Sequence, residues 1–149
     1  MRQGNRWKSV ADELEKSLYG EQIVCSMSTE LYHIPKTKKL EGNNNMHRFL
    51  VPASYHRVTA VGSAIRMVNG YITPSVLKTL ILCIQQAEDQ DKGVRKNLKV
   101  MLKAAPEPYK PFVENIIQWQ DYAELHLQHA KQLTMQMTGS SSWQDSSSN

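Results

Sequence analysis

The sequence contains few of the residues that break helices or cross-link a chain. Its 149 residues include seven glycines, six prolines and two cysteines. Cys25 and Cys83 form no CxxC pair and no disulfide framework, so we expect reduced thiols in a cytoplasmic protein. Because Gly and Pro are scarce and the longer segments have helical spacing, we expect most of the chain to fold.

Long hydrophobic runs are also lacking. The most apolar stretch, residues 60–84, is interrupted by Arg66, Asn69, Pro74 and Lys78, which disfavours a membrane span. The first sixteen residues contain no apolar core of the kind that a secretory signal requires. We therefore expect a soluble protein with no membrane partner.

The familiar catalytic motifs are missing as well. The sequence contains no Walker-type loop, no GxGxxG run and no HExxH motif. Neither cysteine lies in a recognisable nucleophile elbow, and Cys83 is surrounded by Leu and Ile, where burial makes a thiol unreactive. We therefore expect a protein that is not an enzyme.

His126 and His129 form the one pattern that suggests a metal. Three residues apart on a helix, they can turn two imidazoles toward one ion, and Asp121 and Glu124 lie close by in the sequence. No matching Glu-x-x-His pair occurs elsewhere, and two histidines supply only half of a four-ligand zinc site. We predict that this pair packs at the surface, and we predict no metal ion and no cofactor.

The first half of the chain predicts two helices and a loop. In residues 5–19, apolar side chains from Trp7 to Leu18 recur at three- and four-residue steps, and Gly20 is a natural stop. Residues 21–34 fit a helix but also alternate like a strand. We favour a helix there because no partner strand is apparent. Residues 35–45 contain Pro, Gly and three Asn, which predicts a loop.

The second half predicts further helices. Val58, Val61, Ile65 and Val68 recur at helical spacing over residues 54–69. The next helix opens with Thr73 as its N-cap and a proline at its first position, and an acidic turn at residues 88–91 precedes another helix. Residues 104–111 read as a stiff connector before a long final helix over residues 111–137.

The predicted fold class is all-α, a small bundle of about five helices with a long C-terminal helix and a disordered Ser-rich tail. Residues 1–138 form the single helical domain, and residues 139–149 form the tail. A long final helix has more apolar surface than short neighbours can cover, which favours assembly with other subunits.

Charge supplies the functional hypothesis. The net charge is +4, and residues 91–103 would place five cations on one helix face, opposite Val94, Leu98 and Met101. A lysine cluster in the 35–45 loop and an arginine in the next helix add to this charge. These candidate nucleic-acid-binding residues are Lys92, Arg95, Lys96, Lys99, Lys103, Lys36, Lys38, Lys39 and Arg57. A solvated outer face is an equally ordinary explanation for the stripe.

The residues therefore predict a sequence-independent, nucleic-acid-binding accessory subunit of a larger nucleoprotein complex. Its partners would be an RNA or DNA backbone and other protein subunits of an assembly, for which copies of the same chain are one candidate. Residues 47–57 mix aromatic and basic side chains, namely His47, Arg48, Tyr55, His56 and Arg57, and arginine planes and tyrosine rings can stack on unpaired bases. A tyrosine such as Tyr55 is more often a half-buried core residue, so this role is secondary. By analogy of fold and charge alone, the small helical subunits of RNA-guided CRISPR effector complexes are such proteins. The alternative is a helical adaptor that docks an acidic protein partner through the same basic face.

Overall fold

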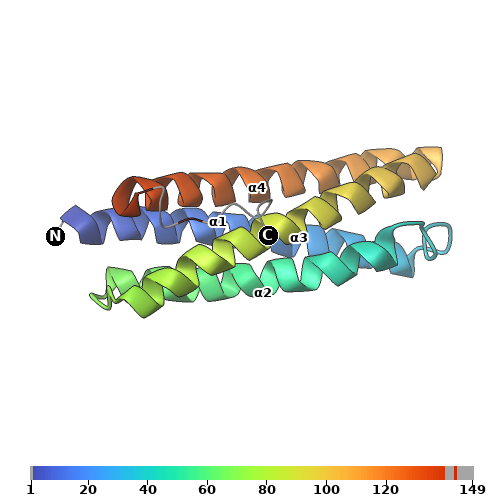
Figure 1. Ribbon diagram of the computed structural model, residues 1–149. Coiled ribbons are helices and arrows are strands. Elements are labelled where there is room, and N and C mark those ends of the chain that lie inside the picture. The colour runs from blue at the N-terminus through green and yellow to red at the C-terminus, as the bar shows by residue number, and fades with distance from the viewer. Residues whose placement is uncertain (1, 140–142, 144–149) are drawn as a thin grey trace.

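The computed structural model describes residues 2–139 and Trp143, and in these residues it contains four long α-helices and no strand (Figure 1). The helices are α1 (Arg2–Glu30), α2 (Asn43–Val68), α3 (Pro74–Ala104) and α4 (Lys110–Thr138), with short 3-10 turns at Leu31–His33 and Glu107–Tyr109. The all-helical bundle is confirmed, but four helices replace the predicted five. Apart from Gly139 and Trp143, the predicted tail lies outside the described residues.

α1 continues through Gly20, where the sequence predicted a stop. Gly20 is buried, and a Cβ at this position would lie 2.9 Å from Tyr122 Cδ1 and 3.2 Å from the Cβ of Ala123 in α4. The glycine therefore lets two helices approach closely and does not end one. The ambiguous segment from residue 21 is helical to Glu30, as favoured, and ends in the first 3-10 turn.

α2 begins at Asn43, inside the segment that was predicted to be a loop. Asn43 is buried, and its Nδ2 donates a hydrogen bond to the Ser28 carbonyl of α1 at 2.9 Å. Gly42, immediately before the helix, has φ of 93°, a left-handed conformation that suits glycine. The asparagine run is thus the start of a helix that is fixed to α1, and Pro52 lies within this helix.

α3 is one helix where the sequence predicted two. Its start is as predicted, because Thr73 Oγ1 accepts a hydrogen bond from the Val76 amide at 3.2 Å. Two of the acidic residues that were predicted to form a turn, Glu88 and Asp91, remain helical and have their partners on other helices. Glu88 lies 3.0 Å from Lys131 of α4, and Asp91 is buried in the bundle. α4 starts and ends within one residue of the prediction.

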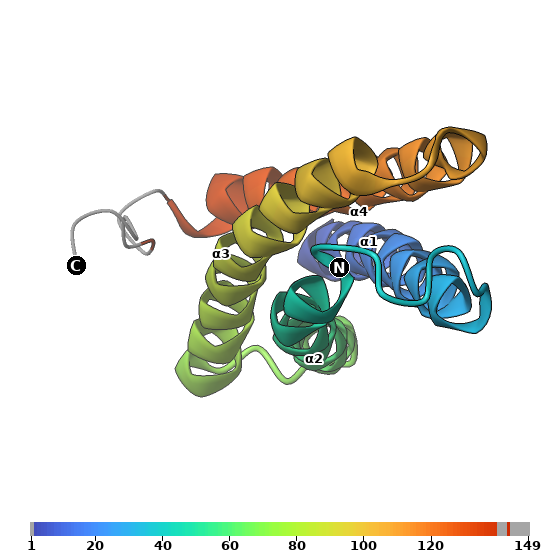
Figure 2. The ribbon, with the colours of Figure 1, turned by 90° about the vertical axis from the view of Figure 1, so that its right-hand side faces the viewer.

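The four helices pack mainly as two pairs, α1 with α4 and α2 with α3, and α1 also contacts α2 (Figures 1 and 2). The core is divided into two apolar clusters, one toward each end of the bundle. The first cluster includes Trp7, Leu14, Met67, Leu80, Ile84 and Leu127. The second includes Val24, Leu50, Leu98, Met101 and Ile116. Polar side chains separate the two clusters.

Within the described residues, no helix has both the length and the apolar character needed to cross a lipid bilayer. This finding agrees with the interrupted hydrophobic pattern of residues 60–84.

Candidate functional site

The centre of the bundle contains a buried polar layer, which consists of Ser17, Glu21, Arg57, Asp91 and Gln120. Arg57 of α2 is 0% exposed, and its guanidinium donates hydrogen bonds of 2.9 and 2.7 Å to the two carboxylate oxygens of Asp91 in α3. Its Nε donates to Ser17 Oγ of α1 at 2.8 Å. One arginine therefore ties three helices together.

Glu21 of α1 lies beside this arginine without a hydrogen bond. Its Oε1 is 3.4 Å from Arg57 Nη1, and neither carboxyl oxygen has a hydrogen-bond partner among the described residues. Burial raises the pKa of Glu21 to about 8, against the opposing effect of the Arg57 charge and with help from the charge of Asp91. Glu21 is therefore largely protonated at neutral pH, and Arg57 and Asp91 form the charged pair.

The polar layer corrects one sequence prediction. Arg57 was predicted to help bind nucleic acid, but its side chain is fully buried and already bonded to Asp91 and Ser17. A buried guanidinium that is held by a carboxylate cannot reach a phosphate outside the bundle. The role of Arg57 is internal, and the prediction for this residue is wrong.

A second cation of the predicted basic face, Arg95 of α3, is held in an ion pair with α4. Arg95 is half-buried, with Nη2 donating to Asp121 and Nε donating to Glu124 at 3.2 Å, both on α4. This contact links α3 to α4 and neutralises the arginine. Lys92 lies 3.6 Å from Asp89, but both side chains are exposed, and such a pair contributes little.

Lys96, Lys99 and Lys103 are the part of the face that remains open. All three are exposed, and no carboxylate in the described part of the chain lies within 4.0 Å of their ammonium groups. Residues beside them on the helix contact α2: Asn97 Oδ1 accepts a hydrogen bond from Asn45 at 3.0 Å. With Arg95 bonded to α4 on the other side, the three lysines face away from the bundle.

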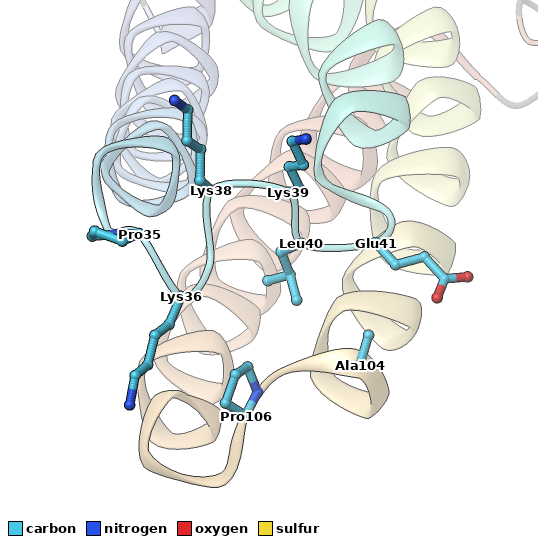
Figure 3. A pocket seen from close by; sticks show the side chains of 8 residues that line it. All are labelled: Pro35, Lys36, Lys38, Lys39, Leu40, Glu41, Ala104 and Pro106. Carbon is cyan, nitrogen blue, oxygen red and sulfur yellow. The ribbon is translucent and has the colours of Figure 1, made fainter.

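The loop between α1 and α2 brings a second set of lysines to the same end of the bundle. Lys36, Lys38 and Lys39 are exposed and line an open hollow together with Ala104 and Pro106, which follow Lys103 along the chain. Figure 3 shows Lys36 extending toward the α3–α4 turn, whereas Lys38 and Lys39 extend away from it. We call the six exposed lysines the basic end: Lys36, Lys38, Lys39, Lys96, Lys99 and Lys103.

The charge of the chain is concentrated around the basic end. Residues 30–50 and 96–114 contain eight of the eighteen Lys and Arg residues and four of the fourteen Asp and Glu residues. The other ten cations and ten carboxylates balance, so the net charge of +4 belongs to these two segments. Both lie at the end of the bundle that faces the viewer in Figure 2. The positive charge of these two segments is expected to attract a polyanion to this end.

The structure divides the mixed aromatic and basic segment around Tyr55. Tyr55 is exposed near the middle of α2, and its ring lies against His56. His47 is half-buried, with Nε2 3.1 Å from Ser28 Oγ and its ring beside Tyr32. His47 therefore joins α2 to α1, and Tyr55 is the member of this segment whose ring is open to a partner.

An apolar stripe runs along the outer face of α2. Val51, Tyr55, Val58 and Ile65 are each more than 40% exposed and follow one another at helical spacing. Val58 and Ile65 helped to predict the helix, yet they do not pack into the core. The inner face carries small residues such as Ala53, Ala60 and Ala64, which permit close helix packing. We call the four exposed residues the α2 stripe.

The structure adds a third side chain to the two histidines that the sequence singled out. Glu13 of α1 is hydrogen-bonded to both imidazoles, with Oε2 3.0 Å from His126 Nδ1 and Oε1 2.7 Å from His129 Nδ1. Asp121 and Glu124, the acidic residues close in sequence, are bonded to Arg95 instead. Glu13 is more than 110 residues away along the chain, and no local pattern could have identified it.

The cysteines agree with the sequence expectation that their thiols do not pair. Both are free, Cys83 buried in α3 and Cys25 partly buried in α1. Burial raises the pKa of the Cys83 thiol, which suppresses the thiolate form at neutral pH. Cys83 is thus part of the core.

Comparison with known proteins does not add a functional residue. No protein-family model, curated protein or solved structure matches this chain. The properties of its own side chains therefore carry the functional argument.

Proposed function

We propose that the protein is a non-enzymatic, nucleic-acid-binding accessory subunit that contacts a phosphate backbone through the basic end. The observation that carries the proposal is that Lys96, Lys99 and Lys103 of α3 and the three lysines of the α1–α2 loop are all exposed, and that the loop lysines line one hollow with Ala104, the residue after Lys103. Six ammonium groups without carboxylate partners in the described residues suit a polyanion whose charges are regularly spaced.

The chemistry of the basic end favours binding that does not depend on sequence. Lysine ammonium groups contact phosphates as point charges and carry no base recognition by themselves. All six side chains of the basic end are lysines, so this set offers contacts to phosphates and no planar group for stacking on a base. The proposal is therefore that the protein coats or positions a strand whose sequence another component selects.

The α2 stripe supports the second half of the proposal, membership of a larger complex. Four large apolar side chains in a row on one helix form a surface that another protein, or a second copy of this chain, can cover. This surface lies along the length of the bundle, whereas the basic end lies at one extremity. One subunit can therefore hold a strand and a protein neighbour at the same time.

The competing proposal is an adaptor whose basic end docks an acidic protein. The two differ in their response to salt, because release of condensed counterions makes nucleic-acid binding fall steeply with ionic strength. A protein interface with an apolar centre is much less sensitive. This difference decides between them without knowledge of the natural partner.

The test is charge reversal at the basic end with a charge-matched control. The triple variant Lys96→Glu, Lys99→Glu, Lys103→Glu should lose binding to single-stranded and duplex oligonucleotides, measured by fluorescence anisotropy. The control changes three exposed cations at the opposite end of the bundle: Lys8→Glu, Arg66→Glu and Lys78→Glu. If the control variant loses as much affinity as the triple variant at the basic end, the loss reflects net charge. If neither variant loses affinity, the three lysines do not contact the nucleic acid. Either result would show that the basic end is not the binding site.

A further inference from the structure

The cluster of Glu13, His126 and His129 lies away from the basic end, near the N-terminal half of α1 and the C-terminal half of α4. The three side chains can each offer a ligand atom such that all three atoms lie within 4.8 Å of one another. Two imidazoles and one carboxylate on two packed helices are the ligand types of a zinc site that keeps one position open.

From this geometry we propose that Glu13, His126 and His129 bind a zinc ion, with water or an external ligand at the fourth position. The inference does not rest on the proposed function, since none of the three residues belongs to the basic end.

The hydrogen-bonded distances are close to those that a zinc ion requires. Zn–N and Zn–O bonds of about 2.1 Å at tetrahedral angles hold neighbouring ligand atoms about 3.4 Å apart. Nδ1 of His126 lies 3.0 Å from Glu13 Oε2, and Nδ1 of His129 lies 2.7 Å from Glu13 Oε1. A zinc ion that takes the place of the hydrogen-bonded protons would therefore draw on groups that already meet at one point, all three ligand atoms lying within 4.8 Å of one another.

The surroundings hold the ligands in place and leave an approach from solvent. His126 and Glu13 are each about 15% exposed at the side chain, whereas His129 is 43% exposed. The ring of Tyr122 packs edge-on against His126, with 4.4 Å between ring centroids. In the part of the chain that the structure describes, Lys16 is the one lysine or arginine within 4.0 Å of the carboxylate, with its Nζ 3.5 Å from Glu13 Oε2, and its exposed side chain can move away. This partial burial excludes much of the water that would compete for the ion.

The types of ligand also select the metal. The mixture of imidazole and carboxylate favours zinc over the calcium and magnesium ions, which prefer oxygen ligands alone.

The test is direct titration of zinc chloride into chelator-treated, full-length protein by isothermal calorimetry. The expected result is one zinc ion per chain. Glu13→Gln, which keeps the shape of the side chain and removes its charge, should weaken binding by about tenfold or more, as should His129→Ala. His33→Ala, an exposed histidine outside the cluster, is the matched control and should bind zinc like the parent.

Circular dichroism of each variant separates a lost ligand from a lost fold. If His126→Ala unfolds, Glu13→Gln and the more exposed His129→Ala decide the question. Cobalt substituted for zinc should give the visible absorption of a tetrahedral site in the parent and lose it in Glu13→Gln. Absence of stoichiometric zinc binding by the parent, or equal binding by Glu13→Gln, would show that the cluster is a hydrogen-bonded helix contact only.

Discussion

Arg57 and Asp91, 34 residues apart in the sequence, form a two-pronged hydrogen-bonded ion pair in the middle of the bundle, with distances of 2.9 and 2.7 Å. The pair connects α2 to α3 between the two apolar clusters, where an arginine charge has no access to water. Because the two partners must meet in one geometry, they fix how the helices are aligned along their length.

Removal of the arginine alone should be strongly destabilising. Arg57→Met keeps most of the volume of the side chain but leaves the carboxylate of Asp91 buried without its partner. We expect a loss of about 3–5 kcal/mol in the free energy of unfolding, measured with urea. Arg66→Met, an exposed arginine on the same helix, is the matched control and should change stability by no more than about 0.5 kcal/mol.

Removal of the whole charged group should have a much smaller effect. When Arg57→Met is combined with Asp91→Leu and Glu21→Leu, no buried charge remains to be compensated. We expect most of the lost stability to return, because apolar replacements of buried ion pairs are often neutral or stabilising. If the triple variant is as unstable as Arg57→Met, packing of the arginine is the dominant contribution and not its charge.

The protonation of Glu21 should make stability depend on pH. The pKa of this carboxyl is raised from 4.5 to about 8 by burial, so the folded state binds a proton that the unfolded state releases. Its contribution to stability is therefore fully present below about pH 4.5 and is lost as the pH rises toward 8. Glu21→Gln mimics the protonated acid. The stability of this variant relative to the parent should increase across this range in urea unfolding, and a constant difference would contradict the assignment.

Two helical glycines should respond in opposite ways to the same substitution. A Cβ at Gly93 of α3 would overlap the ring of Phe49 in α2, so Gly93→Ala should destabilise by about 1–3 kcal/mol. Gly62 of α2 has no heavy atom near the position of such a Cβ. Gly62→Ala should therefore stabilise by about 0.5–1 kcal/mol through helix propensity alone. Thermal unfolding of both variants checks the α2–α3 contact.

The α2 stripe offers a test of self-association. If copies of the chain meet through this surface, Val58→Glu should shift the protein toward a monomer in sedimentation experiments and leave its helical content unchanged. Thr59→Glu, next to the stripe on the same helix, is the control. If the parent protein is already a monomer at high concentration, the α2 stripe does not mediate self-association, and its partner must be a different protein.

Sequence periodicity predicted the helices but not how they connect. Thr73 and Pro74 mark a helix start through local chemistry, and that start was correct. Gly20 and the acidic residues near Asp91 were interpreted as helix breaks, because an isolated helix contains no close neighbour that requires the glycine and no partner for the carboxylates. Tyr122 and Ala123 pack over the glycine, and Arg57 takes up the charge of Asp91. Contacts between helices thus override local signals, and a sequence does not display these contacts.

The site residues also fall into two groups, those whose position follows from helix periodicity and those whose position depends on contacts between helices. Lys96, Lys99 and Lys103 share the helix face opposite the buried Leu98, so helical periodicity was sufficient to predict that they are exposed. Arg57 lies on the inner face of its own helix, but a lone arginine is usually exposed and its buried partner is distant. Glu13 was missed for a related reason, since only the antiparallel packing of α1 against α4 brings it to His126.

The most direct test of the central proposal is the salt dependence of oligonucleotide binding by the parent and by two triple glutamine variants. Each phosphate contact contributes about 0.7 to the slope of log affinity against log salt for single strands and about 0.9 for duplexes. Lys96→Gln, Lys99→Gln, Lys103→Gln should therefore reduce the magnitude of the slope by about two to three units, alike on unrelated sequences. The control Lys8→Gln, Arg66→Gln, Lys78→Gln should leave it unchanged. A parent slope near zero, or an equal reduction in both variants, would contradict phosphate binding at the basic end.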